Sequence, residues 1–542
     1  MKKFNNLSIN DLFPLNSRPI PKFLWFMLLI SFILNIIGIN WGLPSSGSTS
    51  WASDEITPAS VMNGIKMKFS NGWSNKYPPL HYYILSSFYL PFYLLDTLNI
   101  INIQSLFITT LFFIIARLIS VLMGTALIFF IYLCGCEVLE KKSALLASFI
   151  TALTPPFLYY SKTANVDIPY LFWFVIAIYF FIRILKYHQS SDYILFAGTA
   201  VFSIATNDLS LGLLILTPFI ILFSLYRYNK TPGKNSSIFK SLANKKTISA
   251  LITGVLLFIL FHNLIFNFSG YKRHLSLISD PSKGDTIFPN NAPGFMSVFI
   301  QTIRHLEFIF GWPIVLVCIL GFIYALTKKK KYPHIFWLLA PCATYYTFII
   351  FILRKNSVRQ LIPIYILMSF FGALGLSYFL HSSRRFKTIK YTLVLILFIN
   401  SALYSFSVDI LMINDSRYHV EQWTQKNIKK HESILLINYI DFSSRNRNFT
   451  NIKYALCPDQ SRIKEINPSY ILINSDRLKS TYPSLYQKIT NHGLGYKQIF
   501  RYKSSPWLSL MPEHKIKGNN HNKIITNLNL INPEIIILKK KR

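Results

Sequence analysis

Residues 109–133 read TTLFFIIARLISVLMGTALIFFIYL, an unbroken apolar run whose single charge is Arg117. A helix that crosses the hydrocarbon core of a bilayer needs about 20 predominantly apolar residues, with a usual range of roughly 17–25. The run therefore predicts a membrane-spanning helix, and similar runs recur along the chain. We expect about eleven spans in all, at 23–40, 109–133, 143–160, 168–186, 193–207, 209–226, 247–267, 306–327, 334–353, 360–380 and 389–408.

The composition supports a polytopic membrane protein. Of the 542 residues, 52% are apolar and only 14% are charged, whereas a soluble domain is about 25% charged. The high apolar content excludes a disordered chain. The net charge of +34 would suit a nucleic-acid-binding protein only if it lay on a solvated domain. Basic residues confined to loops on one side of a membrane explain it better.

The stretch 80–98 is apolar enough to raise the question of a twelfth span. If it crossed the membrane, the basic clusters at 141–142, 183–186, 227–246, 328–331 and 384–390 would all lie outside. If it stays in the interface, these clusters lie inside together with the N-terminus, as the positive-inside rule requires. We therefore expect residues 41–108 to form one long outer loop, with amphipathic segments lying on the membrane surface.

From about residue 409 the apolar runs become short and polar residues dominate. The runs at 434–439, 470–474 and 534–538 are typical of buried strands. The sequence thus predicts three parts: a cytoplasmic segment at 1–22, a membrane domain at 23–408, and a small soluble α/β domain at 409–542. With eleven spans, the α/β domain lies on the outer side.

Basic residues in outer loops run against the sorting rule and need another reason. Lys162, Lys272, Arg273 and Arg359 are of this kind. Contacts with water and lipid headgroups explain any one of them, but together they suggest a site for an anion at the membrane border. Arg359 is the strongest candidate, because arginine binds phosphate through two parallel hydrogen bonds and keeps its charge.

Acidic residues are so few that each outer one is a candidate for chemistry. Asp54 and Glu55 follow a small, polar loop, and Asp167 lies at the outer start of a span. Capping of a helix N-terminus is one explanation for such an aspartate. The other is a general base in a partly desolvated pocket, with a nearby cation to keep it charged. One base with cations suffices for glycosyl transfer from a phosphate leaving group, whereas a glycoside hydrolase needs two carboxylates flanking the bond.

The order of these motifs resembles that of the GT-C glycosyltransferases. The motifs are Asp54-Glu55, Tyr77-Pro-Pro-Leu-His-Tyr82, Tyr159-Tyr-Ser-Lys162 with Asp167-Ile-Pro169, and Arg359-Gln-Leu-Ile-Pro363. Within the fold, the chain is similar to the branch that holds protein O-mannosyltransferases and bacterial lipid A aminoarabinose transferases. Gly311-Trp-Pro313 and Asp415-Ser-Arg417, which leads to Trp423, are also similar. The resemblance extends over residues 20–430.

The resemblance implies a polyprenyl-phosphate-sugar donor, a protein, lipid or envelope-glycan acceptor, and an inverting single displacement. It makes Asp54 the base that takes the acceptor proton and Asp167 the second acid. Arg359 would hold the lipid phosphate. Lys162, Lys272 and Arg273 are further candidates for that task.

The resemblance also implies a loop around the donor and acceptor and leaves metal dependence open. The residues expected in that loop are Glu55, Tyr77, Pro78, Pro79 and His81. Some GT-C enzymes use a divalent cation, for which Glu55 and His81 offer ligands.

One departure from the relatives lies between the fifth and sixth spans. Relatives often carry a lysine followed by an aromatic residue there, and this chain has Thr206-Asn-Asp-Leu209. Asp208 therefore becomes a further site candidate, and Lys272 or Arg273 would have to supply the missing charge.

Three functional hypotheses remain at this point. The first is the glycosyltransferase, placed in a bacterial inner membrane because the abundance of Lys, Asn and Ile suggests an AT-rich genome. The second is a transporter or flippase of lipid-linked sugars, which would carry ionisable residues near the bilayer midplane and two repeated halves. The third is a scaffold that keeps the fold without the chemistry.

Overall fold

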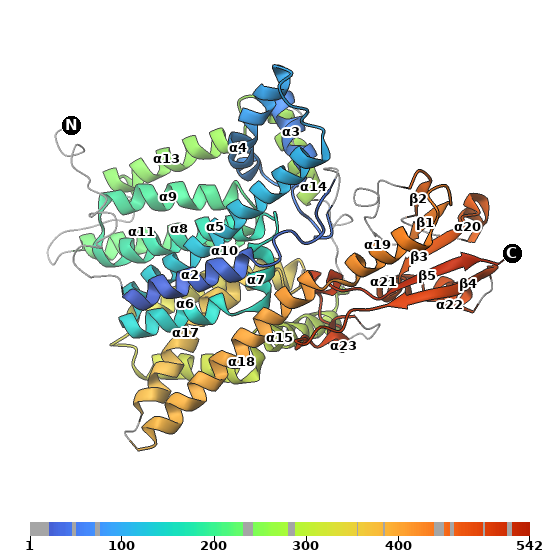
Figure 1. Ribbon diagram of the computed structural model, residues 1–542. Helices are drawn as coiled ribbons and strands as arrows, with labels where there is room; N and C mark the ends of the chain where they lie inside the picture. Colours follow the sequence, from blue (N-terminus) through green and yellow to red (C-terminus); the bar gives the residue numbers. More distant parts are fainter. Residues whose placement is uncertain are drawn as a thin grey trace.

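A computed structural model describes residues 21–45, 50–70, 76–230, 242–279, 288–354, 356–382, 385–437, 449–455, 460–491, 494–517 and 523–541. Figure 1 shows helices lying side by side in one body, with a small domain of strands and helices at one end. This arrangement confirms the expected fold class, a polytopic helical protein with a C-terminal α/β domain. Most of the segment 1–22 lies outside the described residues.

Eleven helical segments of the body correspond one by one to the expected spans. Their bounds are α2 Lys22–Ile36, α5 Leu106–Val138, α6 Lys141–Ala152 with α7 Pro155–Ser161, α8 Asp167–Tyr187, α9 Ser190–Ile204, α10 Leu209–Leu214 with α11 Thr217–Asn229, α13 Lys245–Phe261, α15 Ala292–Thr327, η2 Pro333–Leu338 with α16 Leu339–Tyr345 and η3 Tyr346–Ile352, α17 Ile362–His381, and α18 Lys387–Ile413.

Not all of these segments are long enough to cross a bilayer by themselves. Among the described residues, seven helices have the length and hydropathy of a span, and the bent pair α6–α7, with an angle of 71° at its break, makes an eighth. The remaining three, α2, α9 and α13, have 15, 15 and 17 residues. The structure therefore supports seven or eight of the eleven expected spans by length, and α2, α9 and α13 fall short of it.

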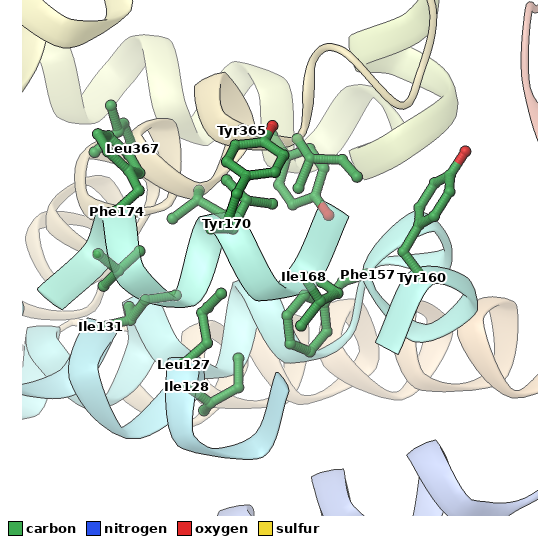
Figure 2. Packing of buried hydrophobic residues seen from close by; sticks show 14 of the residues in the cluster. Leu127, Ile128, Ile131, Phe157, Tyr160, Ile168, Tyr170, Phe174, Tyr365 and Leu367 are labelled. Carbon is green, nitrogen blue, oxygen red and sulfur yellow. The ribbon is translucent and has the colours of Figure 1, made fainter. Parts of the chain in front are cut away.

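Helices α8 and α17 form the centre of the body. Most residues of both helices are buried, and α8 packs on α5 and α9 while α17 packs on α15 and α6. Figure 2 shows Phe174 of α8 beside Leu367 of α17, with Leu127 and Ile131 of α5 on the opposite side of α8. Proline begins several of these helices, since its fixed φ suits the first turn and its missing N–H costs nothing there.

Three helices lie at the end of the body near the α/β domain. They are α3 (Pro58–Lys66), α4 (Leu80–Thr97) and α14 (Phe268–Ser279), and Figure 1 shows them grouped together. Helix α4 covers the ambiguous stretch 80–98 and is not among the helices apolar enough to span. The interpretation of this stretch as an interfacial segment is therefore consistent with the structure.

The C-terminal domain contains a five-stranded mixed sheet of order β2-β1-β3-β5-β4. The strands are β1 Ile434–Ile437, β2 Ile452–Ala455, β3 Tyr470–Asn474, β4 Tyr496–Tyr502 and β5 Ile535–Lys540. Strand β1 pairs in parallel with β2 and β3, and β5 pairs antiparallel with β3 and β4. The three predicted strands are β1, β3 and β5, whose residues face cores on both sides of the sheet.

Helices complete the domain and connect it to the body. Helix α19 (Ser416–Asn427) follows directly on α18, and the others are α20 Gln460–Ile466, α21 Ser475–Thr481, α22 Pro483–Thr490, α23 Glu513–Ile516 and the short η4 Asn527–Leu530. The domain thus begins where the last membrane helix ends.

Candidate active site

The guanidinium of Arg359 joins three side chains that are far apart in the sequence. Its Nε donates to Oδ1 of Asp167 at 2.8 Å, its Nη1 to Oδ2 of Asp54 at 2.9 Å, and its Nη2 to the hydroxyl of Tyr77 at 3.0 Å. Lys76 adds a second cation, with its Nζ 2.5 Å from Oδ1 of Asp54. The structure thus brings together Asp54, Asp167, Tyr77 and Arg359 as expected, and we call these four residues with Lys76 the ion cluster.

The members of the ion cluster lie in loops or at the start of a helix. Asp54 has a φ of 64°, a left-handed conformation that aspartate tolerates better than most residues. Asp167 is the first residue of α8, and Arg359 lies in the turn before α17. Pro78 and Pro79 separate Tyr77 from α4. They cannot donate backbone hydrogen bonds, so they hold the approach to the helix in a fixed extended or turn geometry.

Exposure differs across the ion cluster and shows which side a substrate can approach. The side chains of Lys76 and Asp54 are 53% and 29% exposed, that of Arg359 is 19% exposed, and that of Asp167 only 3%. One oxygen of Asp167, Oδ2, is buried without a hydrogen-bond partner. Asp54 and Lys76 therefore form the open side, and Asp167 supports Arg359 from beneath.

Electrostatics keep Asp54 ionised. Partial burial alone would raise the pKa of its carboxyl, but Arg359 and Lys76 outweigh this, and the pKa lies below its usual value. Burial would likewise lower the pKa of Arg359, yet the Asp167 carboxylate and the hydroxyls of Tyr77 and Tyr160 hold it well above its usual value. The site therefore presents a carboxylate and a permanent cation 2.9 Å apart.

Glu55, expected in the donor and acceptor loop, is held in a buried ion pair. Nε and Nη2 of Arg117 each donate to one of its carboxylate oxygens at 2.8 Å, and both side chains are nearly inaccessible. The amide of Ala164 donates to the same carboxylate at 2.7 Å, and Arg117 also binds the carbonyls of Ile39 and Trp41. We infer that Glu55 anchors the outer loop next to Asp54 and does not contact substrate.

Lys162, expected to bind phosphate, is also enclosed. Its ammonium pairs with Asp409 of α18 and donates to the carbonyls of Leu34 at 2.8 Å and Ile37 at 2.9 Å. The Lys162 and Asp409 side chains are at most 1% exposed. We therefore correct the expectation for Lys162: it joins α7 to α2 and α18, and its ammonium has no room for a phosphate.

Asp208 lies next to α14, the helix that carries Lys272 and Arg273, which we expected to supply the positive charge missing at position 208. Its Oδ2 is 2.9 Å from Nε2 of His274. Lys272 and Arg273 precede His274 on the exposed side of α14, and Nζ of Lys272 lies 5.0 Å from the ring centre of Phe268 on the same helix. The structure thus brings Asp208 and α14 together.

His81 does not combine with Glu55 in a metal site. It is fully buried on α4, and burial lowers the pKa of its ring to about 4. Within the described part of the chain neither ring nitrogen has a hydrogen-bond partner, while both Glu55 oxygens are bound by Arg117. Among the residues that the structure describes, no group of three His, Cys, Asp or Glu side chains is placed to hold a metal ion. The pair Glu55 and His81 therefore does not fit a cation.

Two partners that sequence reasoning missed are Arg117 and Asp409. Arg117 carries the single charge of the run 109–133, and a lone charge within a span usually has a buried partner. Asp409 closes the last apolar run. Both residues therefore carried a signal of pairing, but nothing in the sequence showed that their partners were Glu55 and Lys162.

Comparisons with known proteins agree with the motifs. The family described as dolichyl-phosphate-mannose-protein mannosyltransferase matches residues 100–266, which include Asp167 and Asp208. No curated protein sequence matches the chain.

Solved structures of two proteins are also similar. The apo structure of ArnT from Cupriavidus metallidurans is 9% identical, with a TM-score of 0.46 over 95% of this chain and 97% of that one. The oligosaccharyltransferase AglB from Archaeoglobus fulgidus, in complex with an inhibitory peptide and a dolichol-phosphate, is 14% identical, with a TM-score of 0.44 over 91% of this chain and 75% of that one.

The family match starts just before α5 and ends after α13, so it falls on the helices that surround α8. Of the five residues of the ion cluster, only Asp167 lies within the matched range. The match confirms the resemblance drawn from the motifs over residues 100–266, where the chain is similar to the dolichyl-phosphate-mannose-protein mannosyltransferase family.

Proposed function

We propose that the chain transfers a hexosyl or pentosyl group from a polyprenyl-phosphate donor to a protein, lipid or envelope-glycan acceptor. The reaction takes place at the outer face of a bacterial inner membrane. The observation that carries the proposal is the ion cluster, in which a partly exposed carboxylate and an arginine lie 2.9 Å apart. The matched family, whose description contains a dolichyl-phosphate-mannose donor and a protein acceptor, supports a lipid-phosphate sugar as donor.

The two groups suit the two ends of such a reaction. Asp54 takes the proton from the acceptor hydroxyl, whose oxygen then attacks the anomeric carbon of the sugar. The bond from that carbon to the phosphate oxygen breaks, which releases polyprenyl phosphate and inverts the anomeric centre in a single displacement. A positioned base typically contributes about 10²–10⁴-fold to a rate.

Arg359 stabilises the charge that builds on the departing phosphate. A guanidinium has five N–H donors, and three of those of Arg359 hold Asp167, Asp54 and Tyr77. Two donors therefore remain for phosphate oxygens. Lys76, exposed beside Asp54, adds a mobile positive charge at the entrance. Preorganised cations of this kind act without reorganisation as the charge develops.

Asp167 acts through Arg359. Because its carboxylate is almost inaccessible and binds Nε of Arg359, it fixes the plane of the guanidinium. As the second acid of the site, Asp167 orients the guanidinium of Arg359.

The proposal is tested by comparing lipid A, glycans and glycoproteins, by mass spectrometry, in cells with the wild-type chain, without it, or with Asp54→Asn. Asp54→Asn removes the base but keeps the size of the side chain, so we expect transfer to fall by about 10²–10⁴-fold. Asp96→Asn is the matched control, because Asp96 lies in the same outer loop and binds only the amide of Ile103 among the described contacts.

Normal transfer by Asp54→Asn would end the assignment of the base. Movement of lipid-linked sugars across proteoliposomes, with no glycosylated product, would favour the transporter.

A further inference from the structure

One segment of the C-terminal domain packs as part of the membrane domain. Residues 523–532, which we call the docking segment, lie between α23 and β5. The side chains of Ile524, Leu528 and Ile531 are at most 2% exposed, and they join the core of the helical body. The two cores of the sheet contain none of them. The docking segment thus belongs to the body by packing, although it belongs to the domain by sequence.

The backbone of Ile525 connects two parts of the helical body. Its amide donates to Nε2 of His305 on α15 at 3.2 Å, and its carbonyl accepts from the amide of Val358 at 2.9 Å. Val358 directly precedes Arg359. The docking segment therefore holds, through a main-chain hydrogen bond, the turn that carries the phosphate-binding arginine.

A buried polar network supports the same turn from α15. Nδ1 of His305 lies 2.9 Å from Oδ1 of Asn356, and Nδ2 of Asn356 donates to the carbonyl of Val298 at 2.7 Å and to Oγ1 of Thr302 at 2.9 Å. Since Nε2 of His305 accepts the amide of Ile525, the neutral ring carries its proton on Nδ1 and donates it to Asn356. His305 thus joins the docking segment to the turn.

The docking segment also reaches the other half of the ion cluster. The amide of Asn532 donates to Oδ2 of Asp415 at 2.9 Å, and the same oxygen accepts Nε1 of Trp41 at 3.0 Å. The ring of Trp41 packs on that of Trp51 at 6.1 Å, three residues before Asp54. The docking segment therefore bonds directly to the turn before Arg359, and it reaches Trp51, near Asp54, only through the side chains of Asp415 and Trp41.

From these contacts we infer that His305 and Asn356 are positioning residues for Arg359, and that the docking segment makes the C-terminal domain an integral part of the active site. The network consists of polar groups inside a protein core, where apolar side chains would pack at lower cost. Such networks fix one arrangement when every member is satisfied. The inference rests on the proposed function only where lipid binding is concerned, because the position of the turn can be measured without any substrate.

The first experiment measures hydrogen–deuterium exchange of the full-length protein in detergent. His305→Ala removes the bonds of the ring to Asn356, to the Ile525 amide and to the side-chain amide of Gln301. We expect exchange of the backbone amides of residues 356–361 to rise about tenfold or more, because loss of a buried hydrogen-bond partner costs about 1–3 kcal/mol. His188→Ala is the matched control: His188 is also buried, with Nδ1 3.1 Å from the hydroxyl of Tyr193, and it lies in the turn between α8 and α9, outside the network. Exchange at 356–361 that is unchanged in His305→Ala would overturn the inference.

The second experiment measures binding of undecaprenyl phosphate. We expect His305→Ala to weaken binding, His305→Gln to restore part of it because its amide oxygen accepts the Ile525 amide, and the double variant His305→Ala/Arg359→Gln to bind no worse than Arg359→Gln alone. A merely structural role would add its own loss to that of Arg359, and such additivity would overturn the inference. If the wild-type protein binds no undecaprenyl phosphate, the proposed function fails while the exchange result still decides the inference.

Discussion

At the entrance to the ion cluster, Lys76 and Arg359 hold the Asp54 carboxylate from two sides, at 2.5 and 2.9 Å. The two cations differ in what they do. Arg359 is mostly covered and held by Asp167, whereas the side chain of Lys76 is about half exposed and pairs with Asp54 from the solvent side. An exposed ion pair contributes little to stability. The main effect of Lys76 is therefore to lower the pKa of Asp54 and so keep its carboxylate ionised.

The pKa of Asp54 leads to a prediction for the pH dependence of transfer. Partial burial raises this pKa, but Arg359 and Lys76 lower it further than burial raises it. Asp54 therefore stays ionised as the pH falls below the usual range of a carboxyl group, and the acid limb of the pH–rate profile lies below that range. Lys76→Met removes one of the two cations, so the pKa rises and activity is lost at a higher pH than in the wild type.

Lys66→Met is the control for this prediction, because Lys66 lies in the last turn of α3 of the same outer loop and makes no described contact with Asp54. An acid limb that stays in place in Lys76→Met would show that Lys76 does not act on the base. The measurement is the initial rate of sugar transfer between pH 3 and pH 7.

For single residues, the sequence was a good guide to which side chains are candidates for the site, but a poorer guide to the role of each one. Acids are so scarce that Asp54 and Asp167 stood out, and Arg359 stood out as a cation beside a span. Lys162 had the same signature, yet its partner is Asp409, 247 positions later. A separation of this size along the sequence does not reveal how close two residues lie in space. A lysine that binds substrate and a lysine in a buried ion pair therefore look alike in the sequence.

Among the helices, the contact between α15 and α17 depends on two glycines. A Cβ at Gly321 would lie 1.8 Å from the carbonyl oxygen of Phe371, and a Cβ at Gly375 would lie 2.2 Å from that of Val317. Small residues allow membrane helices to approach until their backbones touch. The contact matters for the site because α15 carries His305 and α17 follows the Arg359 turn.

Gly321→Ala is therefore expected to destabilise the protein by about 1–3 kcal/mol, the usual cost of overpacking a core, and to lower the melting temperature in detergent. Gly254→Ala is the matched control, since its Cβ would meet only Ala197 at 3.8 Å. Alanine is also the better helix former by about 1 kcal/mol, so the control melts at or above the wild-type temperature. Equal melting of both variants would contradict the close approach.

Long apolar runs made the helices of the body easy to predict, because span length is set by the thickness of the bilayer. Their ends were less predictable. We expected a span to start at residue 306, but helix α15 begins fourteen residues earlier, at Ala292. The helix is interrupted at Gly311, which has a φ of 72°, and contains Pro313 shortly after. Residues 292–305 include the polar or charged Gln301, Arg304 and His305, so hydropathy does not mark this end of the helix. Helix α14 and strands β2 and β4 were missed for the same reason, since their residues are mainly polar or exposed.

Over the whole molecule, the basic residues are distributed unevenly between the two ends of the helical body. Basic residues in the last turns of α8 and α11 and after α15 lie at one end of the body, whereas the start of α8, which carries Asp167 of the ion cluster, and the C-terminal domain lie toward the other end. The positive-inside rule places the first end in the cytoplasm. In this predicted orientation the docking segment holds Arg359 from the outer side, where the proposed lipid-linked donor and acceptor meet.

This orientation predicts which cysteines a membrane-impermeant maleimide labels in spheroplasts, in a background with the five native cysteines replaced by serine. Trp507→Cys lies in the C-terminal domain at a position 78% exposed, and we expect it to be labelled in intact spheroplasts. Lys329→Cys lies in the exposed basic loop after α15, and we expect labelling only after lysis. Since both ends of the body are exposed, accessibility differs between them only through the membrane. Labelling of Lys329→Cys but not Trp507→Cys in intact spheroplasts would place the ion cluster on the cytoplasmic face, and an outer acceptor could then not reach Asp54.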